Sequence, residues 1–151
     1  MNKNAKKKKK GFTLIELIIV LAIMAIIAAI AIPNFSAVRD NSKKKADTQS
    51  CETIKRTVLM LVSDSTLAPQ NNADVAKPKT LTFTAGSDFT TTATSASLSG
   101  TGNSFDGDNT WSDTEKLETA KALKEVKTPQ QAGAHYVVKI NKSGEVAVTL
   151  E

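Results

Sequence analysis

The chain has 151 residues, which is enough for one small domain and a separate segment. Its hydrophobic content of 40% is unevenly spread, because every residue from Leu17 to Ile32 is apolar. The formal charge of +5 belongs to the N-terminal end, where six lysines precede Gly11, and removing them leaves −1. This distribution argues against a nucleic-acid-binding protein, which would carry its basic patch on the folded domain.

The N-terminal end consists of a basic leader followed by a long apolar segment. Residues 1–11 carry the lysines, whereas residues 12–35 are predicted to form one helix of about 36 Å at ~1.5 Å per residue. That length is enough to cross a hydrocarbon core of ~30 Å. Pro33 lacks a backbone donor, so we expect it to kink the helix or to mark a local break.

Residues 36–151 are predicted to hold an amphipathic half-helix and a globular head. Apolar residues at spacings of three and four indicate a helix that runs to about Ser65, and they are Cys51, Ile54, Val58 and Leu61. Cys51 is the only cysteine, so an intrachain disulfide is excluded. We expect its thiol to be a small, partly buried packing group, with an intermolecular bridge as the alternative.

The middle of the head is predicted to contain one strand, a turn-rich stretch and a short helix. Thr80–Thr84 alternates apolar and polar residues and is a candidate strand, while Thr90–Ser99 is either an edge strand or a loop. Phe105–Asp113 is dense in turn residues. Ser112, followed three residues later by Glu115, has the spacing of a capping box that begins a short helix.

The C-terminal end gives the clearest strand pattern. Tyr136–Ile140 and Val146–Leu150 each alternate in polarity and are separated by a loop that contains Gly144. These segments predict an antiparallel hairpin with one apolar face. The apolar stripe at Ile54–Val62 is the expected partner of that face.

Glu16 is the one ionisable residue at the start of the apolar segment. A carboxylate near hydrocarbon costs several kcal/mol unless it is neutralised or paired. A cut between Gly11 and Phe12 would create an α-amino group four residues before Glu16. That amine could pair with Glu16 of its own helix or of a neighbouring subunit, and the second pairing would fix the axial register of a filament.

Residues Lys10–Leu17 (KGFTLIEL) resemble the type IV prepilin motif, and Pro33 lies where that family commonly has a proline. The resemblance implies an α+β pilin fold, in which a long N-terminal helix packs on a small antiparallel β-sheet. It implies that a prepilin peptidase removes the leader after Gly11 and methylates Phe12, and that Glu16 neutralises the new terminus of a neighbour. The absence of a C-terminal disulfide resembles pilins of Gram-positive bacteria such as clostridia.

The implied function is a structural subunit of a type IV pilus that serves adhesion, surface motility or biofilm formation. Its implied partners are copies of itself, the prepilin peptidase, and a platform protein with an ATPase motor. The positive-inside rule predicts a single-pass precursor in the plasma membrane, with the C-terminus outside, before the subunit enters the extracellular pilus. No cofactor is implied.

Several alternatives stay open at this point. A pseudopilin of type II secretion or of competence DNA uptake would share the same architecture. Three further alternatives do not involve a filament. They are a membrane-anchored surface domain that binds a ligand, a plain single-span anchor, and a secretory signal that is cut near Ala29–Ala31.

Other candidate sites are weak. Asp106, Asp108 and Asp113 could supply oxygen ligands to calcium, but they lack the spacing of an EF-hand and suit a turn equally well. His135 is the only histidine and is expected on a strand surface. Since neither His135 nor Cys51 has a recognisable catalytic partner, the sequence does not indicate an enzyme.

Overall fold

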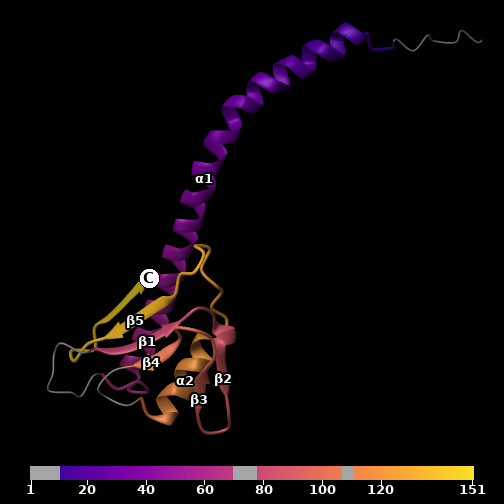
Figure 1. Cartoon of the computed structure of the whole chain (residues 1–151). Coiled ribbons are helices and arrows are strands. Elements are labelled where there is room, and N and C mark those ends of the chain that lie inside the picture. The colour runs from indigo at the N-terminus through magenta and orange to yellow at the C-terminus, as the bar shows by residue number, and fades with distance from the viewer. Residues whose placement is uncertain (1–10, 70–77, 107–110) are drawn as a thin grey trace, which may run out of the picture. The chain divides into compact units, whose positions relative to one another are not determined.

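The computed structural model describes residues 11–69, 78–106 and 111–151 (Figure 1). Most of the leader and Asp108 lie outside the described residues. The chain divides after Asn41 into two compact units, which are considered separately. Helix α1, Leu14–Ser63, belongs in part to each unit, and the second unit, residues 42–151, is called the head below.

In the first unit, α1 carries the apolar run predicted for a membrane segment, and every residue of α1 up to Asn41 is exposed. The helix continues through Pro33, which excludes a break at that position. The kink at Pro33 stays a prediction.

In the head, α1 ends at Ser63, close to the predicted end at Ser65. Its last turns bury Ile54 and Val58, which lie four residues apart and therefore on one face of the helix. Ser65 adopts a positive φ of 57°, a conformation that ends the helical path, and Leu67 returns to the core, where it is fully buried.

A four-stranded antiparallel sheet forms the second layer of the head. Its strand order is β4-β1-β5-β6, so the two central strands are β1 and β5. The strands are β1 (Lys79–Phe83), β4 (Ser104–Asp106), β5 (Tyr136–Ile140) and β6 (Val146–Leu150). The predicted C-terminal hairpin is confirmed, with Val138 opposite Val148, and Gly144 takes a φ of 79° in its turn.

The hydrophobic core lies on one face of this sheet. Leu81 pairs with Val138 and Phe83 with Tyr136, and all four side chains are buried on the same face. Ile54 of α1 belongs to the same cluster. The predicted packing of the α1 stripe on the C-terminal hairpin is therefore confirmed, and the head is a two-layer α+β unit.

The remaining elements lie beside α2, Asp113–Leu123 (Figure 1). Its predicted capping box is present, because Ser112 Oγ accepts from Glu115 N and Ser112 N donates to Glu115. The stretch predicted as one edge strand or a loop forms two short strands, β2 (Phe89–Thr91) and β3 (Ala96–Leu98), which pair as a hairpin. Both strands of this hairpin contact α2, and these contacts stabilise the hairpin.

The sequence pattern placed Phe105 in a turn-rich stretch, and the structure places it in a strand instead. Residues 104–106 form β4 and pair with β1, although their composition is typical of a turn. Phe105 packs edge-on against Trp111, with ring centroids 5.0 Å apart. The sequence pattern failed here because a three-residue strand shows no recognisable alternation, and only the neighbouring β1 makes it a strand.

Buried polar contacts join distant parts of the head. Lys79 is 3% exposed, and its Nζ lies 2.7 Å from Glu115 Oε1 and 4.7 Å from the centroid of the Trp111 ring. Asp47 of α1 is also buried and accepts hydrogen bonds from the backbone N of Gln130 and of Gln131, at 2.7 Å and 3.2 Å. These contacts hold the head together where no intrachain disulfide can.

Candidate processing and assembly site

The predicted cleavage point lies just before α1. Gly11, Phe12 and Thr13 have no regular secondary structure, and the helix begins at Leu14. All three residues are exposed, and Phe12 exposes 90% of its surface. The bond between Gly11 and Phe12 is therefore outside the helix, in the kind of segment that peptidases cleave.

Thr13 and Glu16 form a capping box at the start of α1. Thr13 N and Thr13 Oγ1 each donate a hydrogen bond of 2.8 Å to Glu16 Oε2. In return, Glu16 N donates to Thr13 Oγ1 at 3.4 Å. The two residues satisfy donors of the first turn that have no partner within the helix.

Thr13 was not singled out by the sequence reasoning, although its signal was present. Thr13 and Glu16 stand three residues apart in front of an apolar run, which is the same pattern that predicted the Ser112–Glu115 cap. Glu16 therefore has a structural role as a capping residue in addition to its carboxylate charge.

The carboxylate of Glu16 stands at the edge of a wholly apolar surface. From Leu17 to Ile32 each side chain is exposed, and exposed apolar surface of this extent marks a contact with a membrane or with another protein. In the described part of the chain, α1 is the helix that is long and apolar enough to cross a membrane, by length and composition. A carboxylate in such surroundings requires a cation or a proton.

The structure does not bring the candidate calcium ligands together in its described residues. Asp106 accepts a hydrogen bond from the Ser104 hydroxyl, whereas Asp113 accepts one of 2.9 Å from Ser95 Oγ. Asp108 lies outside the described residues, and the described ones contain no cluster of three metal-ligating side chains.

Cys51 and His135 are both half-buried and contact neighbouring residues of the head. Cys51 is half-buried against the core, and burial together with the charges of Asp47 and Glu52 raises the pKa of its thiol, which disfavours the reactive thiolate. His135 is half-buried beside β5, with Nδ1 2.9 Å from Thr84 Oγ1.

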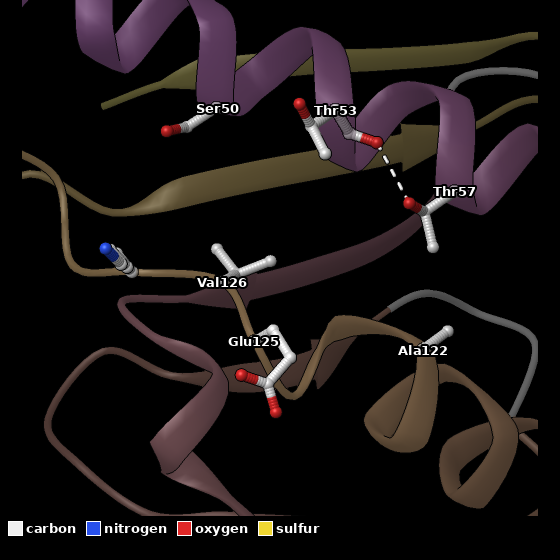
Figure 2. Close-up of a pocket in the computed structure, with 7 residues that line it drawn as sticks. Ser50, Thr53, Thr57, Ala122, Glu125 and Val126 are labelled. Atoms are coloured by element: carbon white, nitrogen blue, oxygen red, sulfur yellow. Dashed lines mark hydrogen bonds between the residues drawn. The ribbon is translucent and has the colours of Figure 1, made fainter.

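A groove of about 250 Å³ lies between α1 and the C-terminal end of α2 in the head (Figure 2). Its lining consists of Ser50, Thr53, Thr57, Ala122, Glu125, Val126 and Lys127. The hydroxyls of Thr53 and Thr57 donate to the backbone oxygens of Gln49 and Thr53 in their own helix. A hydroxyl that donates to a backbone oxygen has no base to remove its proton, so these two groove hydroxyls are not activated as nucleophiles.

Comparison with known proteins assigns the N-terminal segment. A family model described as the prokaryotic N-terminal methylation motif matches residues 6–32. The chain carries this methylation motif. The motif includes Gly11, Phe12, the Thr13–Glu16 capping box and the apolar run as far as Ile32.

The similar proteins have pilin-related names. The chain is 51% identical over 67 residues to prepilin peptidase-dependent protein A of Clostridium perfringens, a match that covers 44% of this chain and 48% of the relative. It is 60% identical over 37 residues to the type IV major pilin protein PilA of Myxococcus xanthus, covering 24% of this chain and 17% of that protein. It is 64% identical over 33 residues to the type IV wide pilus major component PilA4 of Thermus thermophilus, covering 22% and 25%.

These matches cover half or less of each relative's length. No solved structure matches the chain significantly. The similarity therefore supports the recognition of a methylation motif of the type IV pilin kind, and the long helix with an antiparallel sheet is consistent with the α+β pilin fold.

Proposed function

We propose that the chain is a structural subunit of a type IV pilus. It is inserted in the membrane as a prepilin, cleaved after Gly11, N-methylated at Phe12 and polymerised into a filament. The observation that carries this proposal is the exposed apolar helix whose N-terminal end presents a non-helical Gly11–Phe12 bond and the carboxylate of Glu16. The methylation motif and the pilin names of its relatives support it.

The apolar segment has two successive environments in this proposal. Before cleavage, residues 12–35 span the membrane, and the lysines of the leader hold the N-terminus on the cytoplasmic side. The head is then outside. After cleavage, the lysines are lost and the same apolar surface packs against copies of itself, which removes it from both lipid and water.

Glu16 supplies the specificity of this packing. Hydrolysis of the Gly11–Phe12 bond leaves a carboxylate on Gly11 and an ammonium group on Phe12. When that ammonium group meets Glu16 of a neighbouring subunit, two charges in an apolar filament core neutralise each other. A subunit in the wrong axial register would leave both charges unpaired.

The proposal makes the chain a building block and not an enzyme. Its partners are other copies of the chain, the prepilin peptidase that cuts it, and the platform protein and ATPase motor that extend the filament. The pilus would serve adhesion, surface motility or biofilm formation.

The experiment that tests the proposal is measurement of the N-terminus and intact mass of the protein from its native host. We expect a chain that begins at Phe12 and carries one methyl group on its α-amine, recovered from sheared extracellular filaments. Cleavage near Ala31, or a chain that keeps its leader, would contradict the proposal. The Gly11→Leu variant is the control, because a bulky residue before the cut should leave the leader attached.

A further inference from the structure

We infer that the Thr13 hydroxyl positions the cleavage site: by capping α1 through Glu16, it keeps the Gly11–Phe12 bond out of the helix and available to the peptidase. This inference rests on the proposed function, since it concerns the same cut. It makes Thr13 a positioning residue, which acts on the reaction through the conformation of the substrate chain.

The geometry of the cap defines where the helix begins. The first helical hydrogen bond of α1 runs from Leu17 N to Thr13 O, at 3.3 Å. Thr13 is therefore the N-cap residue, which lies just outside the helix and accepts its first hydrogen bond. Glu16 Oε2 binds both Thr13 N and Thr13 Oγ1, and Thr13 Oγ1 accepts from Glu16 N. The hydrogen bonds between Thr13 and Glu16 thus favour a helix that begins at Leu14.

The apolar surroundings make this cap more consequential than one in water. Backbone N–H groups that enter the hydrocarbon without a partner cost free energy, because no solvent is present there to bond them. Without the Thr13 hydroxyl, the chain can satisfy these groups by extending the helix toward the lysine leader, where water is available. Gly11 and Phe12 would then be inside the helix, and their peptide bond would be held in helical hydrogen bonds.

Cleavage itself needs this bond to be free of the helix. Water adds to the Gly11 carbonyl carbon, the bond to Phe12 N breaks, and a proton is left on the new amine. A peptidase must bind the chain on both sides of the bond and reach that carbonyl, which a helical turn obstructs. Thr13 and Glu16 therefore stabilise the start of α1, and the Gly11–Phe12 bond before it stays accessible to the peptidase.

Four single variants of the full chain test the inference, in membranes that contain the prepilin peptidase. Thr13→Val keeps the shape and branching of the side chain but removes the hydroxyl, and Thr13→Ser keeps the hydroxyl. Glu16→Gln keeps a capping-box residue without its charge, whereas Glu16→Leu removes the cap. The rate at which the leader is lost is followed by intact mass.

We expect Thr13→Val and Glu16→Leu to be processed roughly fivefold more slowly than the wild type, which is the factor that corresponds to the loss of one N-cap. Thr13→Ser and Glu16→Gln should be processed at close to the wild-type rate. Glu16→Gln should then fail to form filaments, which separates the processing role of the cap from the assembly role of the charge.

Other outcomes overturn the inference. A Thr13→Val chain that is processed at the wild-type rate would show that the hydroxyl has no part in presenting the bond. A Thr13→Ser chain as slow as Thr13→Val would show that the hydroxyl is not the determinant. A wild-type chain that keeps its leader contradicts the proposed function together with the inference, so the two failures are distinguishable.

Discussion

Among the described residues, α1 and α2 both begin with a capping box, and the two boxes differ in what surrounds them. At α1, Thr13 is capped by Glu16, and at α2, Ser112 is capped by Glu115. In both cases a hydroxyl residue and a glutamate three positions later satisfy the first backbone donors. Glu16 lies on an exposed apolar helix, whereas Glu115 is buried in the head.

The difference lies in the second oxygen of each carboxylate. Glu115 uses Oε2 for its cap and Oε1 for Lys79, at 2.7 Å, and for the backbone N of Ala68, at 2.9 Å. For Glu16, both donors from Thr13 reach Oε2. Glu115 therefore has its cation inside the subunit, and the proposed cation of Glu16 is the Phe12 amine of a neighbour.

The same local motif can therefore stabilise a folded core or present a charge for contact with another molecule. A buried carboxylate with its own lysine stabilises the head once its partners are in place. A carboxylate on an unpartnered apolar surface stays costly until another molecule arrives. The following variants test this contrast.

The largest expected effect is the loss of filaments in Glu16→Gln. The amide can still cap α1 but cannot neutralise an ammonium group in an apolar core, so we expect a processed, folded subunit that does not assemble. Filaments are counted by electron microscopy after shearing, and the processed mass is measured in the membrane. A normal number of filaments would refute the pairing of Glu16 with the Phe12 amine.

The same substitution in the other capping box should instead destabilise the head. In Glu115→Gln, Lys79 stays buried without its counter-charge, and we expect the free energy of unfolding to fall by about 4 kcal/mol. Urea unfolding of the full chain in detergent can be followed by the fluorescence of Trp111, the only tryptophan, which is buried in the head.

The matched control is Glu118→Gln. Glu118 forms an equally short ion pair of 2.7 Å with Lys121, but their side chains are 38% and 57% exposed, so water reaches this pair. Surface pairs contribute about 0–1 kcal/mol, so this variant should unfold almost as the wild type does. Equal losses in Glu115→Gln and Glu118→Gln would remove burial as the reason for the difference.

The two halves of α1 should respond differently to the same loss of side-chain volume. Ile54 is 0% exposed, and Ile54→Ala should lower the stability of the head by about 3 kcal/mol through the cavity that it leaves. Ile23 is 52% exposed, and Ile23→Ala should leave Trp111-monitored unfolding unchanged. A loss of head stability in Ile23→Ala would contradict the division of the helix into a core-packed half and an unpartnered half.

The smallest effect expected is a dependence on pH. Burial raises the pKa of Glu115, but the hydrogen bonds from Lys79, Ser112 N and Ala68 N outweigh it and lower the pKa below its ordinary value of 4.5. The stability from this group is therefore present above the unfolded pKa and is lost as the pH falls through the folded one. We expect wild-type unfolding free energy to decline below pH ~4.5, and Glu115→Gln to decline less. Parallel pH profiles would exclude Glu115 as the source.

The elements that could be predicted were those defined by nearby residues. The α2 cap needs only Ser112 and Glu115, and the C-terminal hairpin needs only two alternating segments and a turn. The elements that were missed depend on distant partners. β4 is a strand because β1 lies beside it, and the β2–β3 hairpin is held by its contacts with α2.

The sequence by itself determined the local features of the N-terminal segment. The order of leader, Gly11, Phe12, Glu16 and apolar run is local, and it predicts a cleavable, membrane-length helix without reference to the head. The tertiary structure alone decided how the head is held together. Lys79 meets Glu115 across 36 positions, and Asp47 meets Gln130 across 83. No periodicity records such pairs, because they form only when the fold brings distant segments together and burial makes an unpaired charge costly.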